Sequence, residues 1–103
     1  MLDNIDGVLD MASGRPIPAI LDSFIHVRAT ERAFQIISEA AKELPAGYRE
    51  AEPRVPWRSI IGIGNLLRHE YYRIDPAVLA DILTNELPML RSADLRLMER
   101  VAE

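Results

Sequence analysis

Apolar residues recur along this chain at spacings of three and four positions, which is the period of an amphipathic helix. The pattern predicts a short helix over residues 3–12, ended by Ser13-Gly14 and by the two prolines that follow. It then predicts a long helix from about Ser23 or Ile25 to Leu44. The buried stripe of that long helix is expected to consist of Ala33, Ile36, Ile37, Ala40, Ala41 and Leu44.

The second half of the chain predicts two more helices after a proline-marked loop of some ten residues. The first runs from about Pro56 to Tyr72, with the proline suited to its first turn. The second opens at Asp75-Pro76, a capping side chain followed by proline at the first helical position. Pro88 is expected to kink this helix near Thr84, whose carbonyl loses its amide partner. Its apolar stripe is Leu79, Ile82, Leu83, Leu87, Leu90 and Leu97.

No stretch alternates with period two, so the fold class is expected to be all-α. Helices joined by short connections predict an antiparallel four-to-five-helix up-and-down bundle. The length fits a single domain over residues 1–103. Because the first helix is short, the core of one chain is expected to be thin, and a second copy would cover the remaining apolar surface. A homodimer is therefore expected.

Composition argues against several classes of protein, among them membrane, secreted and zinc-binding proteins. The longest apolar run is four residues, too short for a membrane span, and the start lacks the pattern of a secretory signal. No Cys and two His argue against disulfides and structural zinc, so we expect a cytoplasmic protein without metal or cofactor. A net charge of −4 does not favour binding to nucleic acid through bulk electrostatics, and no DNA partner is expected. Eleven of the twelve basic residues are Arg, which suits phosphate recognition but is also typical of a GC-rich genome.

One cluster near the end of the third predicted helix contains residue types that are used in proton transfer and phosphate binding. His69 can carry a proton near neutral pH, Arg68 precedes it, and Asn65 lies one turn earlier on its helical face. A His beside an Arg suits RNA cleavage without a metal. The His would move a proton to or from the 2′-hydroxyl or the leaving oxygen, and the Arg would stabilise the phosphorane. The same pattern also fits a surface His or a helix C-cap.

Four longer stretches match, in order and spacing, the motifs of one family. Residues 32–45 match R-x-L-E-I-I-G-E-A-A-K-x-L-P, and residues 55–62 match I-P-W-x-x-I-x-G. Residues 65–75 follow R-N-x-L-x-H-x-Y-x-x-x-D from its Asn onward, and residues 85–88 match N-x-L-P. Over about residues 28–92 the chain thus resembles the HepT-like ribonuclease toxins of the all-helical HEPN superfamily.

The resemblance implies the toxin of a type VII-like toxin–antitoxin module. Such a toxin is a homodimeric, metal-independent endoribonuclease whose substrate is RNA, with tRNA as one candidate, and whose antitoxin partner is a nucleotidyltransferase. By position, His69 would be the catalytic acid and base, and Tyr71 would be the tyrosine to which the antitoxin attaches AMP. The added phosphate would block the cleft by bulk and by charge. Asn65, Arg32 and Glu39 would support that cleft, although the last two also fit a solvated charged strip.

The most serious departure from the family pattern lies in the motif that contains His69. Where the pattern has Arg, five residues before the His, this chain has Gly64. Arg68 lies one turn on and about 40° around the helix, and is expected to bind phosphate in its place, from the same chain or from a second copy. Gly62 and Gly64 together suggest a close backbone approach across a dimer seam, with a tolerated lesion as the alternative.

Loss of a charge-stabilising donor costs about 10²–10³ in rate, so two other interpretations stay open. The chain fits a catalytically degenerate helical dimer that serves as binding partner and substrate platform for a nucleotidyltransferase. It also fits a purely structural dimer. Trp57, at the start of its helix, is expected to be a packing anchor rather than a base-stacking residue.

Overall fold

The computed structural model describes residues 1–67 and 75–102 of the chain. Every regular element in these ranges is a helix, which confirms the all-α prediction. In chain order the elements are α1 (Leu2–Ala12), α2 (Ile17–Leu21), α3 (Phe24–Glu43), α4 (Ala46–Glu50), α5 (Trp57–Leu67), α6 (Pro76–Asp81), the π-helical turn η1 (Ile82–Glu86) and α7 (Leu87–Ala102).

The longer helices begin and end where their capping residues predict. Helix α1 stops before Gly14, whose φ of 74° lies in the left-handed region. The Ser23 hydroxyl caps α3 by accepting a hydrogen bond from the His26 amide at 3.3 Å. The Asp75 carboxylate caps α6 by accepting from the Ala77 amide at 2.7 Å. These caps fix the entry points of the two longest helical runs.

Two short helices occupy stretches that the sequence predicts as connections. Helices α2 and α4 each begin directly after a proline, whose fixed φ suits the approach to a first helical turn. The Trp57 indole holds α4 against the start of α5, because its Nε1–H donates to the Arg49 carbonyl at 3.1 Å and to the Glu52 carbonyl at 3.0 Å. The side chain also packs on the core, which confirms its role as a packing anchor.

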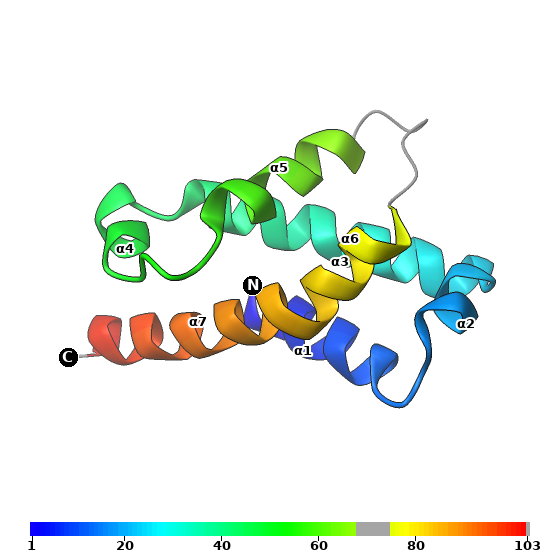
Figure 1. The fold of residues 1–103 in the computed structure, drawn as a ribbon. Coiled ribbons are helices and arrows are strands. Elements are labelled where there is room, and N and C mark those ends of the chain that lie inside the picture. Colours follow the sequence, from blue (N-terminus) through cyan, green and yellow to red (C-terminus); the bar gives the residue numbers. More distant parts are fainter. Residues whose placement is uncertain (68–74, 103) are drawn as a thin grey trace.

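Pro88 produces a widened turn. The amide of Leu87 bonds to the Ile82 carbonyl, five residues back, and the π-helical turn η1 joins α6 to α7. The three elements follow one another as one long bent helix (Figure 1). The expected break is therefore at the expected place, but the helix absorbs the missing amide by widening. All six residues of its predicted apolar stripe are buried.

The buried face of α3 differs from the predicted stripe. Ile37 and Ala41 are buried as expected, whereas the other four predicted positions are only half-buried. Their place is taken by Thr30, Phe34 and Ser38. The two hydroxyls are tolerated in the core because each donates to a backbone carbonyl at 2.7 Å, Thr30 to His26 and Ser38 to Ile61.

The helices lie in two levels around α3. Figure 1 shows α5 running along α3 at one edge of the molecule and α1 with α7 at the opposite edge. Helix α5 packs chiefly on α3, through buried Ile60, Ile63, Gly64 and Leu67. Its other face is not covered by another described helix. None of the described helices is long and apolar enough to cross a membrane.

Candidate functional site

The predicted site lies at the end of α5 and just beyond it. Arg68, His69 and Tyr71 fall in residues 68–74, outside the described residues, so their predicted roles stay predictions. Asn65 is the one predicted site residue on α5 itself, and its side chain is exposed. The last described residue of α5, Leu67, is buried against the core. The core therefore holds α5 up to the residue at which the predicted catalytic segment starts.

The two predicted supporting residues of the second motif both lie on α3. Arg32 is exposed, and its guanidinium donates to the Gln35 side chain at 3.4 Å. Glu39 is half-buried and directly follows Ser38, the residue that contacts α5. Their separation of two helical turns places both on one face of α3, as expected.

Gly64 of α5 lies directly against Ser38 of α3. A Cβ built on Gly64 would lie 2.5 Å from the Cβ of Ser38 and closer still to its hydroxyl oxygen. Real side chains do not approach so closely, so any larger residue at position 64 would push the two helices apart. The Ser38 hydroxyl meanwhile donates to the Ile61 carbonyl at 2.7 Å and so ties α3 to the turn of α5 just before Gly64.

This contact gives Gly64 a packing role within one chain, and the dimer seam expected at Gly62 and Gly64 stays a prediction. The close approach at Gly64 is made within one chain, by Ser38, and a Cβ on Gly62 would meet nothing within 4 Å. The family pattern places Gly where this chain has Ser38 and Arg where it has Gly64. Each arrangement keeps one small residue at the crossing. Gly64 is therefore required by the packing of this chain.

The open face of α5 carries polar residues and positive charge. Arg58, Ser59, Asn65 and Leu66 are exposed, and Gly62 is half-exposed. Arg54, just before the helix, is exposed as well. In the sequence, residues 49–73 hold five arginines against three acidic residues, and this local excess is the one signal that points to Arg54 and Arg58.

Three other arginines of the described part have their charge neutralised by a carboxylate. Arg28 pairs with Glu31 at 2.6 Å, and Arg91 pairs with Asp6 at 2.5 Å. Two nitrogens of Arg96 donate to the Glu52 carboxylate, Nη2 at 2.5 Å and Nε at 2.9 Å from Oε1. These hydrogen bonds hold the pKa of the Glu52 carboxyl below its usual range. No such partner is found for Arg54 or Arg58 among residues 1–67 and 75–102.

The remaining ionisable groups of interest lie away from α5. Burial raises the pKa of the Asp94 carboxyl on α7. The Nδ1 atom of His26, on α3, is buried and has no hydrogen-bond partner in the described part of the chain. Within that part, no three His, Asp or Glu side chains gather as a metal-binding group.

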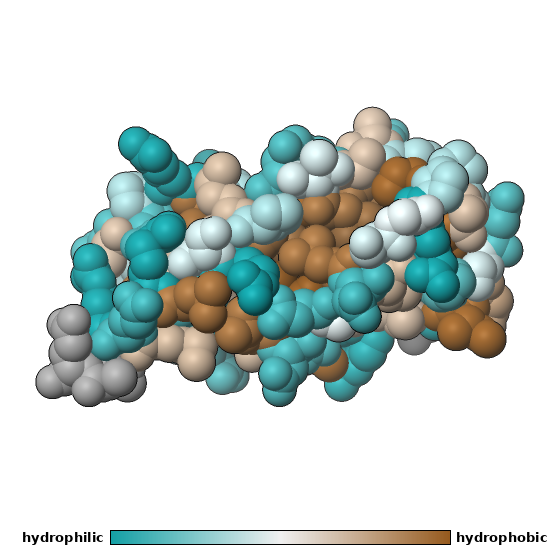
Figure 2. All heavy atoms as spheres, turned by 90° about the horizontal axis from the view of Figure 1, so that it is seen from below, coloured by the Kyte–Doolittle hydropathy of each residue, from teal (hydrophilic) through white to brown (hydrophobic). Residues whose placement is uncertain are grey.

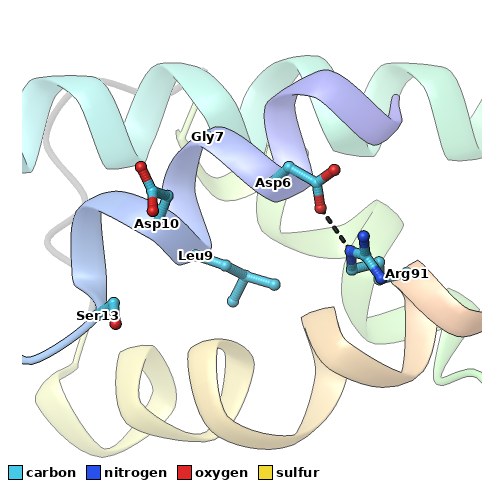
Figure 3. Close-up of a pocket in the computed structure, with 6 residues that line it drawn as sticks. All are labelled: Asp6, Gly7, Leu9, Asp10, Ser13 and Arg91. Atoms are coloured by element: carbon cyan, nitrogen blue, oxygen red, sulfur yellow. Dashed lines mark hydrogen bonds and ion pairs between the residues drawn. The ribbon is translucent and has the colours of Figure 1, made fainter.

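A shallow hollow lies between α1 and α7 and is lined by residues of α1 together with Arg91 of α7. Figure 3 shows the Leu9 side chain entering it and the Asp6 and Arg91 side chains paired across one end. Figure 2, which views the molecule from below, shows hydrophobic residues gathered between polar ones on this face. The hollow offers one ion pair and no His, so it has no group suited to proton transfer near neutral pH.

Comparison with known proteins bears on the whole chain. A family model described as "Ribonuclease HepT-like" matches residues 1–94. The chain is 26% identical over 100 residues to a "Putative RNase" of Caldanaerobacter subterraneus subsp. tengcongensis, covering 97% of this chain and 89% of the relative. It is 36% identical over 63 residues to a "Putative RNase" of Methanocaldococcus jannaschii, covering 61% of this chain and 58% of the relative. A "Probable ribonuclease HepT" of Thermococcus cleftensis is 33% identical over 63 residues, or 61% and 57% of the two chains. No solved structure gives a significant match.

Proposed function

Because the chain belongs to the HepT-like ribonuclease family, we propose that it is an endoribonuclease toxin that cleaves RNA without a metal ion. The observation that carries the proposal is the family match over residues 1–94, which includes the His69 and Tyr71 motif positions. The names of the relatives agree with a ribonuclease. The rigid packing of α5 up to Leu67 supplies a fixed base for the segment that carries His69.

The chemistry is an internal transfer at phosphorus. His69 takes the proton from a 2′-hydroxyl, the 2′-oxygen bonds to the adjacent phosphorus, and the bond from phosphorus to the 5′-oxygen breaks. The leaving 5′-oxygen takes up the proton that His69 has accepted, so the products are a 2′,3′-cyclic phosphate and a 5′-hydroxyl. Arg68 binds the phosphate and stabilises the charge that develops in the transition state. Asn65, Arg32 and Glu39 shape the cleft around this pair.

Regulation in this proposal acts through Tyr71. A nucleotidyltransferase antitoxin attaches AMP to the tyrosine hydroxyl, and the added phosphate occupies the space that the RNA phosphate requires. The toxin works as a homodimer in the cytoplasm. Exposed apolar side chains on the described surface, among them Phe24, Ile25 and Met98, agree with a partner that covers apolar area.

A second candidate function is favoured by one observation, the packing of Gly64. Gly64 is buried against Ser38 and has no side chain. The chain therefore has no guanidinium group at this motif position to bind a phosphate. If no other arginine replaces it, the protein is a binding partner and AMP-accepting platform for the nucleotidyltransferase, without cleavage of its own.

Cleavage of a bulk tRNA pool by the purified protein in EDTA tests the proposal, with His69→Ala beside it. We expect cleavage by the wild type and none by the variant, with 2′,3′-cyclic phosphate ends. The intact mass of the same preparation shows whether AMP is already attached to Tyr71. The Tyr71→Phe variant should not be modified with AMP by the nucleotidyltransferase. An unmodified wild type that leaves RNA intact under all conditions would contradict the ribonuclease and favour the platform.

A further inference from the structure

The open face of α5 combines free positive charge with an unobstructed backbone. Arg58 and Asn65 are exposed on α5, and Arg54 is exposed three residues before its first residue. Neither arginine has an ion-pair partner within the described ranges. Figure 1 shows α5 at the outer edge of the molecule, with α3 on one side only. The charge on this face is thus available to an external anion.

Helical spacing aligns three positions of α5 along one line, and Arg54 lies just before the start of this helix. Arg58, Gly62 and Asn65 follow at intervals of four and three, so they share one face of α5. Arg58 and Asn65 are separated by about 10 Å along the helix axis. Between them, Gly62 presents bare backbone, with nothing within 4 Å of where its Cβ would lie. A sugar-phosphate chain can therefore lie close against the helix at this point.

The positive charge on the open face of α5 indicates which class of ligand it binds. Arg presents several donors suited to phosphate oxygens, and the Asn side chain can donate as well. The whole chain has a net charge of −4, so an isolated positive face directs a polyanion to one location. A second copy docking here face to face would bring unpaired arginines together and would gain little apolar burial, since Leu66 is the large apolar side chain exposed on this helix.

We propose that Arg54, Arg58 and Asn65 form a binding track for the phosphate backbone of single-stranded RNA, running along the open face of α5 toward residue 67. The track deepens the proposed ribonuclease function and rests on it. It binds the flanking nucleotides of the substrate and does not take part in the reaction itself. It gives this chain phosphate contacts that compensate in affinity for the arginine absent at position 64.

Binding in the absence of cleavage tests the track. A short fluorescein-labelled single-stranded RNA is titrated with the His69→Ala protein at several salt concentrations and followed by anisotropy. Adding Arg54→Ala or Arg58→Ala should each weaken binding about fivefold and lower the slope of log affinity against log salt by ~0.7. Arg28→Ala is the matched control, because that arginine is exposed on α3 and paired with Glu31, and it should leave both quantities unchanged.

The outcomes separate the track from the function. If the His69→Ala protein binds the RNA and neither Arg54→Ala nor Arg58→Ala changes affinity or salt slope, the track is wrong and the ribonuclease proposal stands. If the wild type neither binds nor cleaves RNA, the function itself fails and the track fails with it. If Arg58→Ala instead changes the molar mass in solution, measured by light scattering, this face contacts protein and the track is overturned. Circular dichroism of each variant checks that the fold is retained.

Discussion

Ser38 and Gly64 meet across the contact between α3 and α5, with the Ser38 Cβ 2.5 Å from where a Cβ at position 64 would lie. The same serine donates to the Ile61 carbonyl at 2.7 Å, so its position is fixed by a hydrogen bond as well as by packing. The pair sits one turn before the predicted catalytic segment. The spacing of the two helices, and with it the placement of that segment, therefore depends on which of the two positions is small.

The first prediction concerns stability at this contact. Gly64→Ala should lower the free energy of unfolding by about 2 kcal/mol, because the new methyl group overpacks against Ser38. Gly62→Ala is the control on the same helix. It faces open space and should raise stability by up to about 1 kcal/mol through helix propensity. Urea unfolding measures both, and equal effects at the two glycines would contradict the packing argument.

A double-mutant cycle isolates the pair. Ser38→Gly alone should cost about 1 kcal/mol, since it removes a hydrogen bond and adds a helical glycine. In that background Gly64→Ala should cost little, so the coupling energy between the two positions is expected to be about 2 kcal/mol. Additive effects would mean that α3 and α5 separate freely.

Activity should follow the same pair if the protein is a ribonuclease. Gly64→Arg alone is expected to unfold the protein, because a long side chain replaces a buried hydrogen atom. The combination of Ser38→Gly with Gly64→Arg restores the family arrangement and should cleave RNA about 10² times faster than the wild type. Cleavage kinetics on a tRNA pool give the rate. A folded double variant that is no faster would exclude position 64 as a limiting factor.

Asp94 predicts a pH dependence of stability. Burial raises its pKa in the folded state above the unfolded value, so the neutral form favours folding. That contribution is complete below the unfolded pKa and is lost as pH rises through the folded pKa. Asp94→Asn should therefore be more stable than the wild type at neutral pH, and the difference should shrink in acid. Urea unfolding over a pH series measures it, and a constant difference would contradict the burial effect.

The pH dependence of stability expected from Glu52 has the opposite sign to that expected from Asp94. Its pKa is lowered first by the hydrogen bond from Arg96, so the stabilising pair exists above the unfolded pKa and is lost as pH falls through the folded value. Replacing Arg96 by Gln should lower the midpoint of thermal unfolding slightly at neutral pH and leave it unchanged in strong acid. High salt should also reduce the effect, since the Arg96 side of the pair is exposed to solvent. A midpoint difference that persists below pH about 3 would point to lost packing instead.

The longer helices were predictable because apolar spacing and caps such as Ser23 and Asp75 are local signals. The short helices α2 and α4 were not, since proline marks both a break and a first turn. The buried face of α3 was misplaced because hydroxyls look polar in sequence, although Thr30 and Ser38 satisfy theirs on backbone carbonyls. Apolar character alone cannot reveal such internal hydrogen bonds.

The candidate site was predictable only in part. The motif at His69 could be found as a pattern, and it lies outside the described residues. The departure at Gly64 was visible in sequence, but its cause was not, because Ser38 is far away along the chain. The free charge of Arg54 and Arg58 depends on where every carboxylate of the fold ends up. A local count of Arg cannot distinguish a paired guanidinium from an unpaired one.

The contact of α1 with α7 has a consequence for synthesis of the protein. Ile5 and Val8 of α1 are buried in the same core as Leu90 of α7, and the Arg91–Asp6 pair bridges 85 positions of sequence. On the ribosome, α3 becomes available to cover part of α1 early, whereas the face of α1 that packs on α7 is covered only after α7 has emerged. The α1–α7 side of the bundle therefore forms after the α1–α3 side, so the two edges of the core assemble at different stages of synthesis.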